Sequence, residues 1–261
     1  MEFWLLIILT GFVVGGLIGM TGMGGGALMT PILITILKIE PVIAVGTDIT
    51  YAAFTKVAGS FQHIKQKTVD FNLVKNLAYG SIPGAIAGSL LSYFIQKANY
   101  NIDDFVTNAL GIALCLIAIL LFISMFFNVN NLKGRLHDFF HFDKHKKIYV
   151  ALVGLLGGFL VGLTSVGSGT VMLVLILIIY NTSIRKIIGS DIVHATILLF
   201  TAGIAHLFVG NVDWNLVCYL LIGSIPGVII GSKLSARAPK KIIKSVLIIL
   251  LIFFGIRTIL Y

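Results

Sequence analysis

Two short segments rich in glycine and hydroxyl side chains are the places where this sequence could do chemistry. They run from Thr21 to Gly26 and from Thr164 to Gly169, each inside a long apolar stretch. A helix that breaks inside a membrane frees backbone N–H groups, and the helix that restarts concentrates those donors and a partial positive charge. Such a break suits a small oxyanion. The residues expected to bind it are Thr21, Gly22, Gly24, Gly25, Gly26, Thr164, Ser165, Gly167, Ser168 and Gly169.

Five further polar side chains lie in the apolar stretches that follow these segments. Asp48 and Asp191 are expected to begin the next helices near the membrane edge, where a carboxylate caps a helix or, alternatively, gates the path or carries a coupled proton. Tyr51 and His194 follow one turn later and could bind a substrate oxygen. Lys56 is expected inside a span, where it could attract an anion, pair with Asp48 or extend its amine to the interface.

These residues belong to two copies of one sequence, because a shift of 143 positions aligns Gly11–Ser92 with the second half without a gap. GTDI at 46–49 falls on GSDI at 189–192, and GSIPG at 80–84 falls on GSIPG at 223–227. Long repeats in an apolar chain are typical of transporters built from two related halves. Close helix packing is the alternative explanation for glycines at these spacings, and it is favoured for the GSIPG segments.

The composition indicates a membrane protein. Of 261 residues, 58% are hydrophobic and 11% are charged, and the mean hydropathy is +1.04, whereas soluble domains carry about 25% charged residues. The net charge of +9 is assigned to basic loops and not to nucleic-acid binding. Two isolated cysteines, the absence of a phosphate-binding loop and the absence of a nucleophile with its base argue against an enzyme. No cofactor and no metal is expected.

The elements that must position the candidate residues are apolar stretches long enough to cross a bilayer. They cover 3–37, 43–63, 73–95, 105–127, 148–180, 187–208, 214–235 and 242–260. The first stretch of each half is too long for one simple helix, so it is either a single broken pass or a hairpin. Single passes would divide the basic residues outside the membrane nine against nine, whereas hairpins divide them three against fifteen. The positive-inside rule therefore favours hairpins.

The hairpin interpretation fixes the expected architecture. We expect an all-α polytopic membrane protein with two inverted-topology repeats, each a broken helical hairpin followed by three transmembrane helices. Residues 1–127 form the first repeat and residues 148–261 the second. Both termini are expected outside and residues 128–147 in the cytoplasm, as a basic loop or interfacial helix in which His137, His141 and His145 do not converge on a metal.

The order and spacing of these motifs resemble the sulfite exporter TauE/SafE family, also called the toluene-sulfonate uptake permeases. The resemblance rests on Gly16–Gly26, on GTD, on Asp70 and Asn72, on GSIPG, and on their duplication over nearly the whole chain. It implies a secondary transporter of a prokaryotic inner membrane that moves sulfite, thiosulfate, sulfoacetate or other organosulfonates. Ser165 and Ser168 depart from the glycine pattern, so the resemblance selects no single substrate.

Taken together, the sequence predicts a transporter that exposes a midplane anion site to each side of the bilayer in turn, with protons as a candidate coupling ion. Its expected partners are a small anion and the lipid bilayer. A passive anion channel and a non-transporting membrane partner of a sulfur-metabolising enzyme remain alternatives. Direction of transport, coupling ion and oligomeric state are left open by the sequence.

Overall fold

The structure is a computed structural model of the chain. It describes residues 2–21, 26–98, 101–126, 142–167, 169, 172, 175–176, 179–180, 182–235 and 240–260. The fold and the site below concern these residues.

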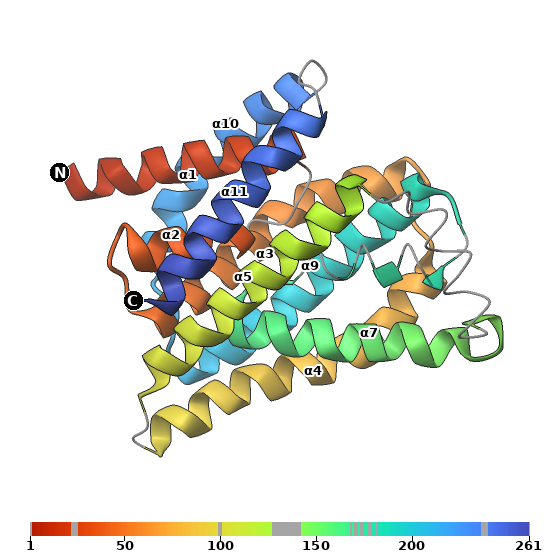
Figure 1. The fold of residues 1–261 in the computed structure, drawn as a ribbon, viewed down its shortest axis with the longest axis horizontal. Coiled ribbons are helices and arrows are strands. Elements are labelled where there is room, and N and C mark those ends of the chain that lie inside the picture. Colours follow the sequence, from red (N-terminus) through yellow and green to blue (C-terminus); the bar gives the residue numbers. More distant parts are fainter. Residues whose placement is uncertain are drawn as a thin grey trace.

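Long helices make up the described part of the chain (Figure 1). They are α1 (Glu2–Thr21), α2 (Gly26–Thr35), α3 (Pro41–Lys65), α4 (Phe71–Lys97), α5 (Ile102–Phe126), α7 (Phe142–Thr164), α9 (Ile184–Val209), α10 (Trp214–Ser235) and α11 (Lys240–Ile259). The predicted all-α class is confirmed.

The outer surface of the bundle is apolar, as a lipid-facing surface must be. Among the described residues, five helices are long and apolar enough to cross a membrane, namely α1, α5, α7, α9 and α10. Large side chains such as Phe208, which is 90% exposed, and Leu156, which is 65% exposed, point away from the protein. In water such a surface would aggregate. The prediction of a multi-pass membrane protein is therefore confirmed.

The first helix of each half is interrupted where the sequence predicts a break. In the first half, α1 ends at Thr21 and α2 begins at Gly26. In the second half, α7 ends at Thr164, and the backbone then turns through positive φ angles at Ser165, Gly167 and Gly169. Gly22, Gly24, Gly25 and Ser168 lie outside the described residues.

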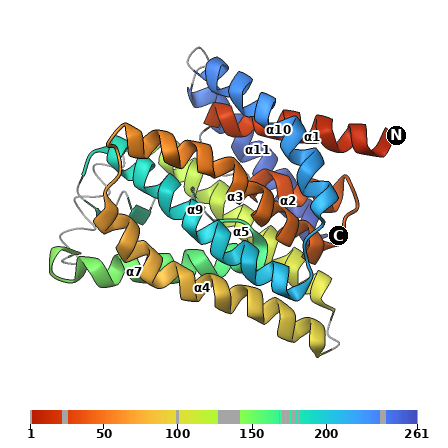
Figure 2. The ribbon, with the colours of Figure 1, turned by 180° about the vertical axis from the view of Figure 1, so that it is seen from behind.

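The first helix of each half packs on the other half of the chain. Helix α1 lies along α10, and α7 lies along α4, so that the two pairs occupy opposite sides of the molecule (Figures 1 and 2). A side chain on Gly80 or Gly84 would overlap the α7 backbone at Ala151 and Leu155. The equivalent glycines of the second half, Gly223 and Gly227, meet the α1 backbone at Ile8 and Phe12.

The close-packing interpretation of the GSIPG glycines is thus confirmed. The contacts repeat at the same 143-residue spacing as the sequence. Ala151 and Leu155, which meet the glycines of α4, are equivalent to Ile8 and Phe12, which meet the glycines of α10.

The remaining helices pair across the two halves in antiparallel fashion. In the α3–α9 pair, Ser60 lies opposite Thr196 and Gly203 lies opposite Thr50. In the α5–α11 pair, Met125 lies opposite Ser245, whereas Gly111, earlier in α5, meets α11 near its end. Each pair joins a helix to its own counterpart in the other half.

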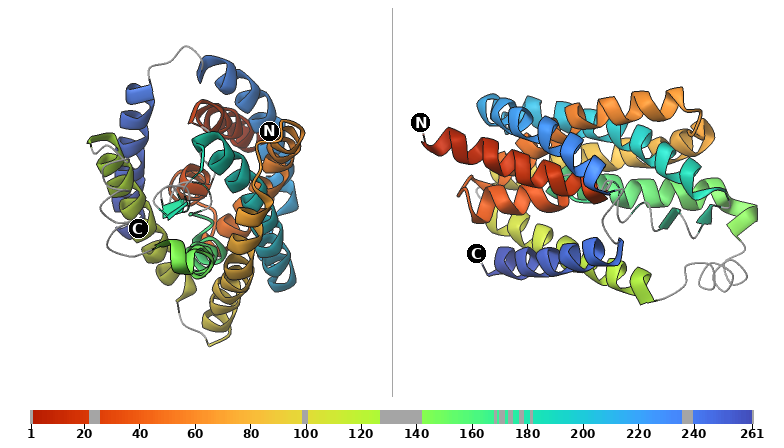
Figure 3. Two further views of the ribbon diagram at one scale, coloured as in Figure 1. Left: turned by 90° about the vertical axis from the view of Figure 1, so that its right-hand side faces the viewer. Right: turned by 90° about the horizontal axis from the view of Figure 1, so that it is seen from above.

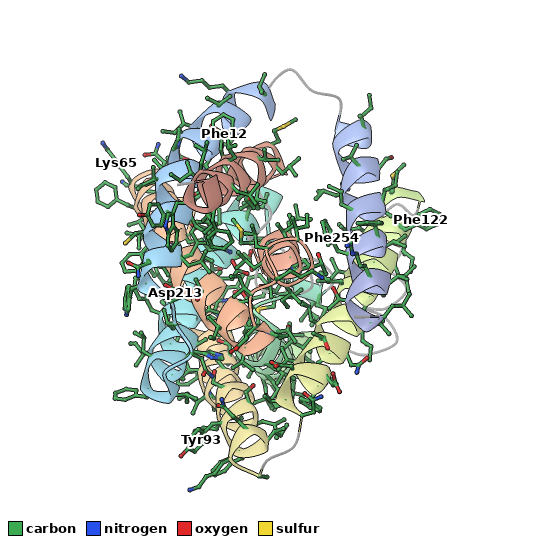
Figure 4. All side chains as sticks on the ribbon, turned by 90° about the vertical axis from the view of Figure 1, so that its left-hand side faces the viewer. Phe12, Lys65, Tyr93, Phe122, Asp213 and Phe254 are labelled. Atoms are coloured by element: carbon green, nitrogen blue, oxygen red, sulfur yellow. The ribbon has the colours of Figure 1, made fainter. Side chains whose placement is uncertain are left out.

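Helix α2 lies in the middle of the molecule when it is seen end-on (Figure 3, left), where it contacts α3 and α11. Its Met29, Leu33 and Ile34 are fully buried. Figure 4 shows that Phe254 of α11 faces this core, whereas Phe122 of α5 lies on the outer side of the molecule. Both termini lie at the same end of the molecule (Figures 1 and 3).

Candidate functional site

Asp48 lies at the centre of the molecule and joins the two halves. Its side chain is 0% exposed. Thr30 of α2 donates a hydrogen bond of 2.5 Å to Asp48 Oδ2, and Ser165, just after the end of α7, donates one of 2.9 Å to the same oxygen. Asp48 Oδ1 is buried and has no hydrogen-bond partner among the described residues. Since buried polar atoms are normally paired, this oxygen marks a place where a proton, a water or a ligand belongs.

The backbone of the second break holds Ser165 in position for this contact. Ser165 has a φ of 63°, in the left-handed region that non-glycine residues rarely adopt. Thr164 Oγ1 accepts a hydrogen bond of 3.3 Å from the Val166 N–H and donates one of 2.7 Å to the Leu160 carbonyl, which closes the helix end. The break therefore directs a hydroxyl, and not only backbone N–H groups, towards the centre.

The expectation that Asp48 and Asp191 begin helices near the membrane edge is wrong. Helix α3 begins at Pro41 and α9 at Ile184, so each aspartate lies seven residues further along its helix. The residues directly before the aspartates, Thr47 and Ser190, are the ones that bind the starts of other helices. Thr47 Oγ1 accepts a hydrogen bond from the Asp213 N–H at 3.0 Å, and Ser190 Oγ accepts one from the Asp70 N–H at 2.7 Å.

Asp70 of the D-x-N motif caps α4. Its Oδ1 accepts hydrogen bonds from the N–H groups of Asn72 and Leu73, at 3.0 and 3.2 Å. Such a cap satisfies donors that the first turn of a helix leaves free. Asp70 thus has a structural role as a helix cap. The aspartates of GTD and GSD, Asp48 and Asp191, instead lie buried in the interior.

Tyr51 and His194 are fully buried at equivalent positions, one turn beyond the aspartates. His194 Nε2 and Ser81 Oγ are joined by a hydrogen bond of 2.7 Å. Ser224, the counterpart of Ser81, lies beside the Tyr51 hydroxyl, which has no hydrogen-bond partner among the described residues. The serine of each GSIPG segment thus faces the ring of the other half.

Lys56 is half-buried on α3, in the part of the helix that runs along α9, and among the described residues no ion pair joins it to Asp191. The expected alternative of a pair with Asp48 is not what the structure shows. Helix contacts explain the geometry, because Ser60, one turn after Lys56, reaches the Ile192 carbonyl at 3.3 Å and the Thr196 hydroxyl at 2.7 Å. Asp191 is 4% exposed, and no described residue is a hydrogen-bond partner of its Oδ1.

The two aspartates have different surroundings although the chain repeats. The equivalents of Thr30 and Ser165 in the other half are Leu173 and Gly22, which carry no hydroxyl. The equivalent of Lys56 is Leu199, which is buried. Asp48 is therefore bound by hydroxyl groups, whereas Asp191 lies near a lysine.

Sequence reasoning missed Thr30, Ser81 and Ser224 as members of this polar centre. The two serines carry a signal, because they repeat at the 143-residue spacing inside GSIPG. Thr30 carries none, since a leucine occupies the equivalent position. The structure brings Ser165, Asp48 and Thr30 together in one hydrogen-bonded group, and joins His194 to Ser81 in another.

The other candidate residues have simpler places. Thr21 ends α1, Gly26 begins α2, and Thr164 ends α7. Gly167 and Gly169 supply two of the positive φ angles of the second break. Four candidate residues lie outside the described residues, namely Gly22, Gly24, Gly25 and Ser168. The described residues contain no cluster of three side chains that could hold a metal ion, and His137 and His141 of the basic segment are not among them.

His206 is 1% exposed, and its Nε2 is hydrogen-bonded to the Gly162 carbonyl at 2.8 Å. His63, its counterpart, is half-buried, and its Nδ1 lies 2.9 Å from Thr68 Oγ1. The two equivalent histidines therefore differ, and the one in the second half belongs to the interior.

Inside the apolar bundle, the described polar side chains include the half-buried Lys56 and the buried hydroxyl groups of Tyr51 and Ser165. Two buried carboxyl groups add places where a proton can be held. Ser81 and His194 are a hydroxyl and an imidazole within hydrogen-bond distance, but among the described residues no third group binds His194 Nδ1 to orient the ring as covalent catalysis requires.

Known proteins resemble the chain over nearly its whole length. The family model described as "Sulfite exporter TauE/SafE" matches residues 7–258. The chain is 39% identical over 253 residues to the "Probable membrane transporter protein YjnA" of Bacillus subtilis, which covers 97% of this chain and 98% of that protein.

More distant relatives carry the same kind of name. The chain is 25% identical over 241 residues to the "Probable membrane transporter protein YdhB" of Bacillus subtilis, covering 92% of this chain and 94% of that protein. It is also 25% identical over 247 residues to MJ0441 of Methanocaldococcus jannaschii, another "Probable membrane transporter protein", covering 91% of this chain and 86% of that protein. No solved structure matches the chain.

Proposed function

Because the chain belongs to the TauE/SafE sulfite exporter family of membrane transporters, we propose that it is a secondary transporter of small sulfur-containing anions. The substrates we propose are sulfite, thiosulfate, sulfoacetate or other organosulfonates, moved across a prokaryotic inner membrane. The family description names sulfite, and the relatives are named transporters, which also favours a protein that is not an enzyme.

The observation that carries the proposal is the hydrogen-bonded bridge at Asp48. It connects α2 of the first half with the helix break of the second half through Thr30 and Ser165. Hydroxyl groups, helix ends and a buried oxygen without a partner come together there, inside a bundle whose outside is apolar. Buried ionisable groups in a membrane are costly and are found where substrates or protons pass.

We further propose that the protein works by alternating access around this site, with two inverted-topology repeats comprising residues 1–127 and 148–261. Equivalent helices pair in antiparallel fashion, α3 with α9 and α5 with α11, which is the arrangement that inverted repeats require. Both termini lie at one end of the molecule, which agrees with a loop at 128–147 on the other side of the bilayer.

The packing suggests which parts move as rigid units. The glycines of α10 and α4 contact the backbones of α1 and α7, and each of these pairs contains one helix from each half. Two halves could not separate without breaking these contacts. The moving units are therefore the α1–α10 pair and the α4–α7 pair, with the α3–α9 crossing between them, in place of one intact half against the other.

Sidedness has its own test. After replacement of Cys115 and Cys218, a cysteine at Gln66 should react with a membrane-impermeant maleimide only from the cytoplasmic side, and a cysteine at Ala98 only from outside. Reaction of both positions from the same side would show that α4 does not cross the membrane, and the proposed topology depends on that crossing.

The transport proposal is tested by flux into proteoliposomes of the purified protein. The substrates are sulfite, thiosulfate, sulfoacetate, methanesulfonate, sulfate and acetate, each measured with and without an imposed proton gradient. Saturable uptake of a sulfur anion that responds to the gradient is expected. Conductance that neither saturates nor responds to the gradient would identify a passive channel. Absence of flux and of any stabilisation by these anions would favour a partner of a sulfur-metabolising enzyme.

A further inference from the structure

The polar group around Asp48 brings three oxygen-bearing side chains to one buried point. The Asp48 carboxylate of α3 is 0% exposed, and so is Thr30 of α2. The hydroxyl groups of Thr30 and Ser165 both lie against Asp48 Oδ2, at 2.5 and 2.9 Å. Ser165, directly after α7, is 1% exposed. Two helices of the first half and the break of the second half thus meet at this point.

No side chain balances the charge of this carboxylate. The structure gives Asp48 two side-chain hydrogen bonds, and neither donor is charged. Among the described residues, no lysine, arginine or histidine forms an ion pair with Asp48. A buried carboxylate without a counter-charge is strongly disfavoured. A positive charge that the described side chains do not supply must therefore accompany the ionised carboxylate.

The end of α7 adds to the negative potential at this point. Ser165 directly follows Thr164, the last residue of α7. A helix C-terminus carries a partial negative charge. In transporters with broken helices, half-helix C-termini and unwound backbone carbonyls are where small coupling cations bind. The surroundings of Asp48 therefore favour a cation, and they oppose an anion as long as the carboxylate keeps its charge.

The two carboxylate oxygens favour a metal cation over a proton. Asp48 Oδ2 accepts both hydrogen bonds, whereas Oδ1 is buried with no hydrogen-bond partner among the described residues. A proton on Oδ1 would be a buried donor without a described acceptor, which is costly. A metal cation instead uses the lone pairs of Oδ1 and those that the two hydroxyl oxygens keep after donating. A single carboxylate balances a single positive charge, so the cation is monovalent.

We propose that Asp48, Thr30 and Ser165 form a binding site for one sodium ion, which neutralises Asp48 and crosses the membrane together with the substrate anion. This inference rests on the proposed transport function and names its coupling ion. No covalent bond is made or broken. A proton occupies the carboxylate when sodium is absent, so sodium and protons compete for Asp48. Sodium and the anion each strengthen the binding of the other, because sodium removes the charge that repels the anion.

The site occurs once although the sequence is duplicated. The positions equivalent to Thr30 and Ser165 hold Leu173 and Gly22, which have no side-chain oxygen. Asp191, the counterpart of Asp48, therefore has no equivalent pair of hydroxyl groups. The proposal predicts one sodium ion per protein, with a binding curve that shows no cooperativity in sodium.

Thermal unfolding of the purified protein tests the site itself. The buffers contain sodium chloride or choline chloride at the same ionic strength and pH. We expect sodium to raise Tm by about 5 °C or more at about a hundredfold excess over its Kd. Asp48→Asn keeps an oxygen for the two hydroxyl groups but removes the charge, so it should abolish the shift. Equal Tm values in sodium and choline, or an undiminished shift in Asp48→Asn, would overturn the proposal.

Conservative variants separate ion binding from a loss of folding. Thr30→Val and Ser165→Gly each remove one hydroxyl ligand, and glycine tolerates the φ of 63° at position 165. Each should weaken the apparent sodium affinity by about tenfold. Thr35→Val is the matched control, because Thr35 is also a buried threonine of α2 but donates to the Pro31 carbonyl. It should keep the full sodium affinity, and a loss as large as that of Thr30→Val would contradict the assigned ligands.

Uptake into proteoliposomes tests the coupling. The pH is equal on both sides, and valinomycin with equal potassium holds the membrane potential at zero. An inward sodium gradient should make methanesulfonate accumulate above its external concentration, with one radioactive sodium ion entering per anion, whereas choline should not. Accumulation driven by a pH gradient and never by sodium would assign a proton to Asp48 and overturn the sodium site.

The two measurements together distinguish failure of this inference from failure of the transport function. Stabilisation by sodium that Asp48→Asn abolishes, without methanesulfonate flux, would support the cation site and contradict anion transport. Saturable methanesulfonate flux that is the same in sodium and choline, without stabilisation by sodium, would support transport and contradict the cation site. Neither stabilisation nor flux would overturn both.

Discussion

At the scale of residues, the centre of the protein shows how a duplicated sequence acquires two kinds of chemistry. Asp48 and Asp191 occupy equivalent positions, yet one accepts hydrogen bonds from two hydroxyl groups and the other lies near a lysine. The difference comes from the neighbours, since Thr30, Ser165 and Lys56 have no polar equivalents. One aspartate thus belongs to a hydrogen-bonded bridge between the two halves, and the other does not.

Ser165 combines a hydrogen bond with an unfavourable backbone angle, and these two effects can be separated. Both Ser165→Ala and Ser165→Gly remove the hydroxyl from Asp48, but only glycine adopts a φ of 63° without cost. We expect the free energy of unfolding of Ser165→Gly to exceed that of Ser165→Ala by about 1 kcal/mol. Ser165→Gly should therefore unfold at the higher temperature. Thermal unfolding in detergent measures this. Equal stability of the two variants would mean that the left-handed conformation is not maintained.

At the scale of elements, the packing of α1 on α10 and of α7 on α4 determines the shape of the bundle. In a membrane, helices associate through van der Waals contact and hydrogen bonds, because lipid is as apolar as the helix surfaces. Glycines that face a neighbouring backbone bring two helices close together. The repeated glycines do this in both halves.

Two adjacent glycines of α1 provide a matched test of this packing. A side chain on Gly15 would lie 2.7 Å from the Ser224 carbonyl oxygen, whereas one on Gly16 would approach nothing closer than the Gly227 oxygen at 3.8 Å. Gly15→Ala should therefore destabilise the protein by about 1–3 kcal/mol relative to Gly16→Ala. Thermal unfolding of both variants in the same detergent gives the difference. If the two variants were equally stable, α1 would not lie against α10 as described.

The α3–α9 crossing should change its geometry during transport, because it lies between the two packed pairs. Ser60 Oγ and Thr196 Oγ1 are 2.7 Å apart across this crossing. Cysteines at both positions, with Cys115 and Cys218 replaced, should form a disulfide under oxidation and stop uptake, and reduction should restore it. Single cysteine variants are the controls. Full uptake by the oxidised double variant would assign the motion to other helices.

At the scale of the whole molecule, the sequence predicts a good part of the fold. The 143-residue repeat, the apolar stretches and the glycine-rich interruptions predict the helices and the two breaks, because each depends on local composition. The glycine spacing of GSIPG predicts a close-packed face. The spacing does not say which helix meets that face. In the structure, the helix that meets each glycine face belongs to the other half of the chain.

The central site was less predictable for the same reason. The aspartates seemed to begin helices because the apolar stretches begin near them, but α3 continues back to Pro41, a residue suited to the first turn of a helix. Thr30 has no repeated partner and therefore no sequence signal. The approach of the α3 segment around Lys56 to α9 depends on the crossing of these two helices, which only the three-dimensional structure supplies.

The most direct test of the account is the accessibility of position 165 from both sides of the membrane. In a protein lacking Cys115 and Cys218, Ser165→Cys is exposed to a membrane-impermeant maleimide from one side or the other, with and without methanesulfonate. The account predicts reaction from both sides, because the site opens to each in turn, and protection by methanesulfonate, because the anion occupies it. Reaction from only one side under all conditions, or no effect of the anion, would contradict a central anion site with alternating access.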